Sequence, residues 1–143
     1  MEDRYLYKAK TTPKEKGEFN NVWVTGNLIV SNGKYYIHPV GNVVNVKNEI
    51  GRIIVMHEVI PDTICQCTGL KDKNGNLIWE NDIVKDEHGN LYKAFWQNNY
   101  YQFSWICVKS DVFSIGAKWD LWSFKSFEIE VIGNIFDNPE LLH

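Results

Sequence analysis

Cysteine, long apolar runs and basic charge are all scarce in this sequence, and each shortage excludes a class of protein. Three cysteines are too few for the disulfide framework of a small secreted domain. No apolar run approaches the ~20 residues of a membrane-spanning helix, and the opening residues MEDRYLYK lack the apolar core of a signal peptide. We therefore expect a cytoplasmic protein that does not enter a membrane.

Apolar residues with a helical period are also scarce, whereas aromatic residues are abundant. The chain contains six Trp, seven Tyr and seven Phe, or 14 % of its residues, and such rings favour pleated, half-buried surfaces. Short alternating stretches are separated by turn residues, which is typical of an all-β protein. The sequence therefore predicts a mainly β fold with a small barrel-like or two-sheet antiparallel architecture. An SH3-like barrel in the C-terminal half is one option.

The length of 143 residues fits a single domain. Pro61 marks a possible subdivision into an N-terminal β region, residues 1–60, and a hairpin-rich C-terminal β region, residues 61–143. A short C-terminal helical turn is expected in DNPELL, because Pro139 suits the first helical position and Asn138 suits the cap before it.

Two Asn-Gly pairs predict tight hairpins. Asn32-Gly33 separates two alternating stretches, and both residues tolerate the positive φ that a two-residue turn requires. The second pair, Asn74-Gly75, lies in TGLKDKNGNLIWENDIV, residues 68–84. There the pair is expected to fix the register between two strands, the second of which is LIWENDIV.

Two stretches of the sequence, TGLKDKNGNLIWENDIV and EVIGNIFDNPELL, resemble the YopX family of phage and prophage proteins. That family carries a Thr-Gly-Leu-x-Asp-x-Asn-Gly hairpin, an EGDIV-like strand and a C-terminal VIGNIxxNPELL signature. The motif residues here are Gly69, Leu70, Asp72, Asn74, Gly75, Asp82, Gly133, Asn134, Asn138, Pro139 and Leu141. Asn81 departs from the family, which usually has Gly at this position, and residues 12–60 match no family motif.

The resemblance implies a mostly β fold, a phage-derived gene and a location in the cytoplasm of the host cell. It implies no activity, because the family is known chiefly as uncharacterised, and no catalytic residue is carried over. The motif residues are interpreted as folding devices that fix the hairpin and fasten the C-terminal end of the chain.

No pattern in the sequence predicts an enzyme, a metal site or a cofactor. Asp72 and Asn74 are spaced like the first ligands of a calcium loop, but Leu77 occupies the sixth position, where that loop needs Gly. Cys65-x-Cys67 lacks the spacing and the partner ligands of a zinc site. The chain contains no nucleophile elbow and no phosphate-binding loop, so we expect a protein without catalytic activity.

The aromatic residues of the C-terminal half are the basis of the functional hypothesis. Adjacent rings such as Tyr100 and Tyr101 point to opposite faces of a strand, so some rings lie on an outer face and need a cover. We therefore expect a binding module that forms a homo-oligomer and contacts an unknown phage or host protein. The predicted interaction surface consists of Tyr100, Tyr101, Phe103, Trp105, Trp119 and Trp122.

The alternative is a nucleic-acid-binding β-barrel, in which rings such as Tyr100, Phe103 and Trp105 stack on bases. The lysines expected to follow the phosphate backbone are Lys8, Lys10, Lys14, Lys16 and Lys93. The net charge of −3 disfavours this alternative, because a surface that follows phosphates usually shows a basic excess.

Overall fold

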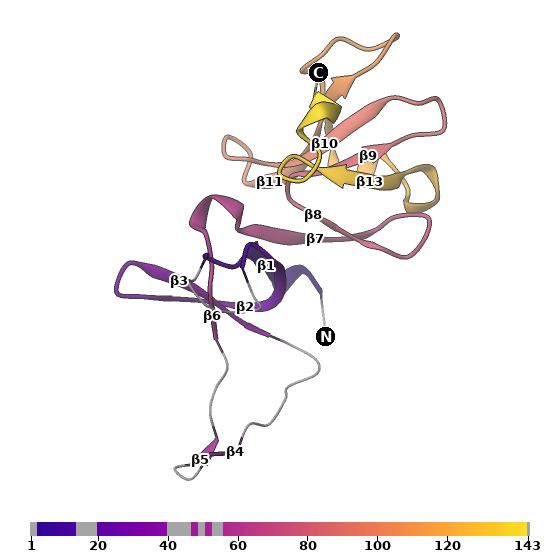
Figure 1. Ribbon diagram of the computed structural model, residues 1–143. Helices are drawn as coiled ribbons and strands as arrows, with labels where there is room; N and C mark the ends of the chain where they lie inside the picture. Colours follow the sequence, from indigo (N-terminus) through magenta and orange to yellow (C-terminus); the bar gives the residue numbers. More distant parts are fainter. Residues whose placement is uncertain (1–2, 14–19, 40–46, 49–50, 53–55, 143) are drawn as a thin grey trace. The chain divides into compact units, whose positions relative to one another are not determined.

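The protein is mainly β, as the sequence predicts. The computed structural model describes residues 3–13, 20–39, 47–48, 51–52 and 56–142, and strands make up 51 % of these residues. The helical elements among them are short 3₁₀ turns. The chain divides into two compact units, Tyr5–Gln66 and Met1–Arg4 with Cys67–His143 (Figure 1).

The unit Tyr5–Gln66 contains an antiparallel sheet. Its strands are β1 (Tyr7–Lys10), β2 (Trp23–Ser31), β3 (Lys34–Pro39), β6 (His57–Glu58) and the start of β7 (Cys65–Lys71), in the order β6-β3-β2-β1-β7. The remaining elements are the strand pair β4 (Lys47–Asn48) and β5 (Gly51–Arg52) and the 3₁₀ turn η2 (Pro61–Thr63). The 3₁₀ turn η1 (Asp3–Tyr5) is shared, since Asp3 and Arg4 belong to the other unit. The buried side chains of Ala9, Ile37 and Val59 form the core of this unit.

The Asn32-Gly33 turn between β2 and β3 has the predicted conformation. The φ angle is 51° at Asn32 and 73° at Gly33, and the strand ends Ser31 and Lys34 pair directly. Positive φ at both residues is the signature of a type I′ hairpin turn, which favours Asn followed by Gly. This turn sets the register of the β2–β3 hairpin.

The unit that contains Cys67–His143 is built around a five-stranded antiparallel sheet. Its strands are β9 (Asp82–Lys85), β10 (Leu91–Gln97), β11 (Gln102–Lys109), β12 (Lys118–Asp120) and β13 (Glu130–Asn134), in the order β12-β11-β10-β9-β13 (Figure 1). The remaining elements are β8 (Leu77–Trp79), which pairs with β7, and the 3₁₀ turns η3 (Leu121–Ser123), η4 (Ser126–Glu128) and η5 (Pro139–Leu142). The turn η5 begins at Pro139, so the predicted C-terminal helical turn is confirmed.

The five-stranded sheet is open, and a closed barrel, one of the predicted options, is not formed. Its edges are β12 and β13, which do not pair with each other in the described part of the chain. β12 has three residues and leads directly into η3, which leaves little strand for pairing around a closed perimeter. The predicted antiparallel two-sheet arrangement describes the architecture.

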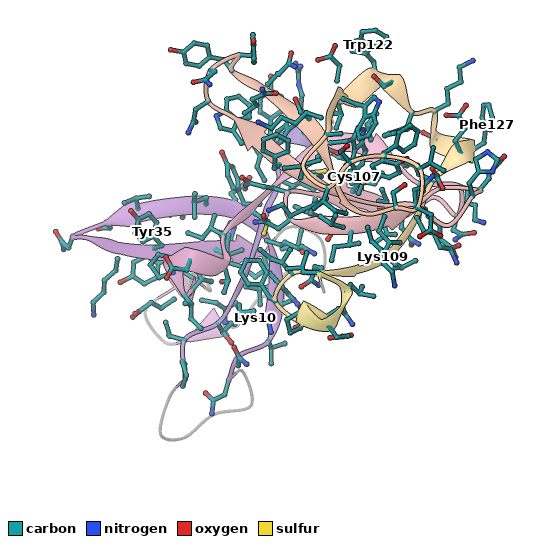
Figure 2. All side chains as sticks on the ribbon, turned by 90° about the horizontal axis from the view of Figure 1, so that it is seen from above. Lys10, Tyr35, Cys107, Lys109, Trp122 and Phe127 are labelled. Carbon is teal, nitrogen blue, oxygen red and sulfur yellow. The ribbon has the colours of Figure 1, made fainter. Side chains whose placement is uncertain are left out.

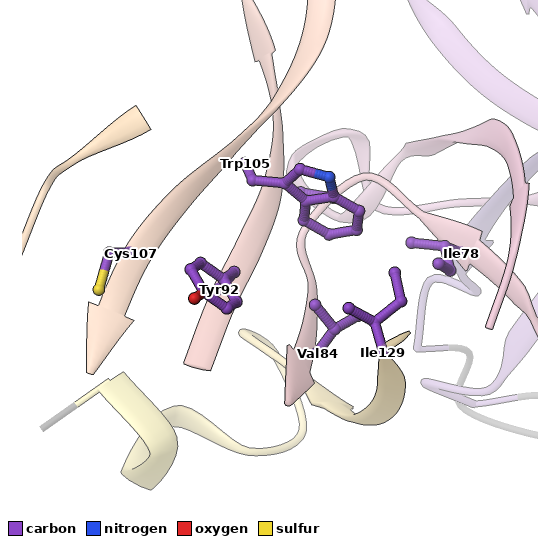
Figure 3. Close-up of a cluster of buried hydrophobic side chains, with 7 residues drawn as sticks. Ile78, Val84, Tyr92, Trp105, Cys107 and Ile129 are labelled. Atoms are coloured by element: carbon purple, nitrogen blue, oxygen red, sulfur yellow. The ribbon is translucent and has the colours of Figure 1, made fainter. Parts of the chain in front are cut away.

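An aromatic-rich core fills this unit. Its buried side chains, drawn in Figure 3, are Ile78, Val84, Tyr92, Ala94, Trp105, Cys107 and Ile129. The indole Nε1 of Trp105 donates a hydrogen bond to the Leu121 carbonyl at 3.1 Å. Trp119 and Phe124 pack against the Tyr92 ring with centroid distances of 5.3 and 4.7 Å. A buried indole with its N–H satisfied contributes a large apolar area to the core at no polar cost.

The stretch LIWENDIV forms two strands, and the prediction of a single strand is wrong. β8 ends at Trp79 and β9 begins at Asp82, and Asn81 between them has a φ of 70°. The buried Asp82 carboxylate closes this turn, because it accepts the Trp79 N–H at 2.8 Å. A left-handed φ favours Gly and tolerates Asn. This explains why the resembled family usually has Gly where this chain has Asn81.

An aspartate organises the hairpin turn at Asn74-Gly75. The Asp72 carboxylate accepts the N–H groups of Asn74, Asn76 and Val131, each at 2.9 Å. Within the loop Asp72 to Asn76, all of which is described, positive φ occurs at Gly75 alone, with 82°. The register therefore depends on the Asp72 carboxylate as well as on the predicted Asn-Gly pair.

The same turn occurs a second time at Asp86. This carboxylate accepts the N–H groups of His88 and Asn90, each at 2.9 Å, and the Tyr92 hydroxyl donates to it at 2.8 Å. Burial raises the pKa of Asp72 and Asp86, but their hydrogen bonds outweigh it, so both pKa values lie below the ordinary value. The repeated pattern Asp-x-x-Gly-Asn, in DKNGN and DEHGN, is the sequence signal for this shared turn.

Two asparagines account for the C-terminal VIGNIxxNPELL signature. Asn134 Oδ1 accepts the N–H groups of Phe136 and Asp137, each at 2.9 Å, and Asn138 Oδ1 accepts the Asn134 N–H at 3.2 Å. A Cβ atom at Gly133 would collide with the Asn138 side chain. The signature therefore encodes a tight loop that joins β13 to η5.

The Gly133→Ala variant is expected to lose about 1–3 kcal/mol of unfolding free energy, as overpacked sites do. The added methyl group displaces the Asn138 amide, and the Asn134 N–H then loses its acceptor. Urea denaturation followed by far-UV circular dichroism measures the change. In an Asn138→Ala background the same substitution should cost less. Equal costs in the two backgrounds would refute this account of the glycine.

Candidate functional site

Three of the six residues predicted to form an interaction surface are exposed. Tyr100 and Tyr101 are 68 % and 82 % exposed, but the prediction that they lie on opposite faces of a strand is wrong. Both lie in the turn between β10 and β11, where Tyr101 has a φ of 52°. Trp122 in η3 is 79 % exposed, and Figure 2 shows it at the periphery of its unit.

The prediction is wrong for Trp105, which is fully buried. Alternation along β11 sends Phe103, Trp105 and Cys107 to the same face, and burial of Trp105 and Cys107 shows that this face packs on the core. Phe103 is half-buried and makes an edge contact with the Trp96 ring at a centroid distance of 5.0 Å. Trp119 is half-buried and packs against the core.

Further exposed apolar side chains were not in the predicted set. In the unit that contains Cys67–His143 they are Val112, Phe113, Ile115, Phe127 and Trp96, and in the other unit they are Tyr5, Val22, Val30 and Met56. The first three lie in the loop between β11 and β12, within the letters SDVFSIG. The signal in the sequence is the presence of large apolar residues in a stretch whose Ser, Asp and Gly residues predict a turn.

A pocket of about 420 Å³ borders Tyr100. The side chains that line this tip pocket are Gln97, Tyr100, Gln102, Lys118, Trp119, Asp120 and Ser123. They come from the end of β10, the turn after it, the start of β11, from β12 and from η3. The pairing of Gln97 with Gln102 and of Ser104 with Asp120 brings the polar members together. The volume lies within the range of roughly 300–1,000 Å³ that is usual for small-molecule sites.

A chain of hydrogen bonds orders the polar side chains of the tip pocket. Gln102 Nε2 donates to Asp120 Oδ1 at 2.7 Å and to Ser104 Oγ at 3.3 Å. Ser104 is buried, and its hydroxyl donates to Gln97 Oε1 at 2.9 Å. Because a carboxylate only accepts hydrogen bonds, Asp120 determines the direction of the whole chain.

A second pocket, of about 270 Å³, lies on the same unit. It is lined by Asp86, Glu87, His88, Phe124, Phe127 and Glu128. Two of its three carboxylates already serve the fold, because Asp86 organises a turn and Glu128 accepts the Lys125 N–H at 3.0 Å. The tip pocket is therefore the better candidate for a ligand.

The lysines of the nucleic-acid alternative have different environments. Lys8 and Lys10 lie on one face of β1, and their Nζ atoms are 4.6 and 5.4 Å from the centroid of the Trp23 ring. Lys93 is half-buried on β10. The remaining two predicted positions, Lys14 and Lys16, lie outside the described residues.

The described residues show neither a metal-binding cluster nor a membrane-spanning helix. They contain no group of three or more His, Cys, Asp or Glu side chains that could hold a metal ion. Cys65, Cys67 and Cys107 are buried, and burial raises the pKa of the Cys107 thiol, which lowers its reactivity. No helix in this part of the chain has the length and apolar character needed to cross a bilayer.

The fold and the site define a class of protein: an open antiparallel β protein with exposed aromatic side chains and an ordered polar pocket. The family model described as YopX protein matches residues 3–143. The chain therefore belongs to the YopX family. The match includes residues 12–60, for which the motifs gave no resemblance. No curated protein matches the chain.

Proposed function

We propose that this YopX-family protein is a non-catalytic binding module that associates with copies of itself. It is encoded by a phage or prophage, acts in the cytoplasm of the host cell and contacts a phage or host protein there. The observation that carries the proposal is the exposure of Tyr100, Tyr101 and Trp122, whose large rings contribute nothing to the core of their own unit at exposures of 68–82 %.

The physical argument rests on the cost of leaving aromatic surface in water. Each such ring can bury about 150–250 Å², and burial of apolar area contributes about 25 cal/mol per Å². Tyr and Trp are enriched at protein interfaces, where they act as anchors. A second copy of the same chain is the commonest partner of an oligomeric surface, because a two-fold axis lets one patch cover itself.

Size-exclusion chromatography with light scattering tests self-association at micromolar concentration. We expect a mass that is a multiple of 16.7 kDa. The double variant Tyr101→Ala, Trp122→Ala should shift the mass towards that of one chain. Val30→Ala, which changes an apolar side chain 58 % exposed on β2, is the control and should leave the mass unchanged. A single-chain mass for the unmodified protein at tens of micromolar contradicts the proposal.

The position of the Lys8 and Lys10 ammonium groups beside the Trp23 ring supports the nucleic-acid alternative. Two ammonium groups beside an aromatic ring suit a strand of nucleic acid, whose phosphates attract cations and whose bases stack on rings. Burial of Trp105 weakens the nucleic-acid alternative, because a buried ring cannot stack on a base.

A gel mobility shift at low salt tests this alternative with single-stranded and double-stranded oligonucleotides. Binding through the lysines should weaken steeply as salt rises, and the Lys8→Gln, Lys10→Gln variant should reduce it further. Absence of any shift at low salt removes the alternative.

A further inference from the structure

The hydrogen-bond chain of the tip pocket leaves a specific set of polar atoms without partners. Gln97 uses Oε1 to accept from Ser104, so its Nε2 donor has no partner among the described residues. Gln102 uses Nε2 to donate, so its Oε1 acceptor has no such partner, and Asp120 Oδ2 is in the same position. This hydrogen-bond chain therefore offers one amide donor and two acceptors whose orientations its own hydrogen bonds set, and the hydroxyl groups of Tyr100 and Ser123 line the same pocket.

A ligand for this set must present the complementary pattern of one acceptor and two donors. The Watson–Crick edge of guanine has this pattern, since O6 accepts while N1–H and the N2 amino group donate. Adenine and cytosine have other patterns on the same edge, and each leaves at least one of the pocket atoms unmatched. A polar atom that a bound ligand covers but does not match loses its hydrogen bonds to water, so pattern complementarity discriminates between such ligands.

The other side chains of the pocket suit a planar base as well. Tyr100 and Trp119 line the pocket with aromatic surface, and single-strand binding proteins use such rings to stack on bases. Lys118 also lines the pocket, and lysine is a common partner of guanine O6 and N7; here its Nζ lies 6.0 Å from the centroid of the Phe95 ring. The volume of about 420 Å³ accommodates a single nucleoside.

We propose that the tip pocket binds one guanine base, with Asp120 and Gln102 accepting from its N1–H and N2 groups and Gln97 donating to O6. The base comes either from a free nucleoside or nucleotide or from an unpaired position in a single strand. This ligand site requires neither self-association nor Lys8 and Lys10, so it goes beyond the function proposed above.

Isothermal titration of the full chain with guanosine, inosine, adenosine and cytidine tests the site. We expect guanosine to bind roughly 5- to 150-fold more tightly than adenosine or cytidine. Inosine, which lacks the N2 amino group, should fall between them. Equal binding of guanosine and adenosine, or binding of neither, overturns the proposal. The mass from light scattering is measured separately, so its result does not depend on this titration.

Titration with oligothymidine, with and without one central guanine, distinguishes the two sources of the base. Tighter binding of the guanine-containing strand than of guanosine indicates an unpaired base, and equal or weaker binding indicates a free nucleoside. Both results support the site. Binding of plain oligothymidine as tight as that of the guanine-containing strand, and at least as tight as that of guanosine, overturns it.

Three variants connect the binding to the pocket. Asp120→Asn removes an acceptor and Gln97→Glu removes the amide donor at nearly constant size, and each should weaken guanosine binding at least about tenfold. Asp111→Asn, an exposed carboxylate outside the pocket lining, is the matched control and should bind guanosine normally. Far-UV circular dichroism establishes that each variant is folded. If Asp120→Asn does not fold, the guanosine affinity of Gln97→Glu tests the proposal. Unchanged guanosine binding in either folded pocket variant overturns it.

Discussion

The Trp105→Ala variant is expected to lose about 3–5 kcal/mol of unfolding free energy, the usual cost of removing a large ring from a core. Trp105 is fully buried, and it packs with Val84 and Ile129 in the core of Figure 3. Its Nε1 also donates to the Leu121 carbonyl, which would lose this donor. Urea denaturation followed by far-UV circular dichroism measures the loss without relying on tryptophan fluorescence.

Trp122→Ala is the matched control for this substitution. It removes the same side chain at 79 % exposure, so the unfolding free energy should change by less than about 0.5 kcal/mol. The two variants therefore separate a core tryptophan from a surface one. If Trp105→Ala kept full stability and instead reduced the mass in solution, the placement of Trp105 in the core would be refuted.

The Asp72→Ala variant is expected to lose about 3 kcal/mol, because three backbone N–H groups lose a charged acceptor at once. These groups belong to Asn74, Asn76 and Val131, and the Asp72 side chain is 3 % exposed, so water replaces the carboxylate poorly. The Asp72→Asn variant should lose less, since one side-chain oxygen remains to accept. Denaturation midpoints in urea at pH 7 measure both variants.

The same carboxylate makes stability depend on pH. Hydrogen bonds from Val131, Asn76 and Asn74 outweigh the effect of burial and hold the pKa of Asp72 below its usual value. Because its pKa is lowered in the folded state, the Asp72 carboxylate contributes its full stabilisation of the fold above the pKa of an aspartate in the unfolded chain, about 3.9. This stabilisation is lost as the pH falls through the pKa of Asp72 in the folded protein. Asp72→Asn should therefore flatten the decline in stability below about pH 4, and an unchanged decline would contradict this role.

Local features of the sequence were predicted well because they depend on residues close together in the chain. Asn32-Gly33 adopts the expected turn, since its positive φ angles are a property of the two residues themselves. Pro139 begins η5 for the same kind of reason. The turn between Trp79 and Asp82 was missed, because Asn81 tolerates both extended and left-handed backbone and its neighbours read as strand.

The candidate site was predicted less well, because its residues come together through strand pairing. Gln97 and Asp120 meet the same hydrogen-bond chain only because β10 and β12 both flank β11 in a particular register. No local spacing links these side chains. The buried Ser104 that connects them looks like any other strand serine in the sequence.

By itself, the sequence determined that this protein is made of antiparallel strands and tight turns, and its motifs indicated the family to which the chain belongs. Alternation also determined that Phe103, Trp105 and Cys107 share one face of a strand. Only the tertiary structure decided that this face is the core, which places Trp105 inside, and that Tyr101 and Trp122 lie outside the strands, in a turn and in η3, exposed to solvent. The physical reason is that a pleat defines two faces but assigns neither of them, and the assignment comes from what the rest of the chain packs against.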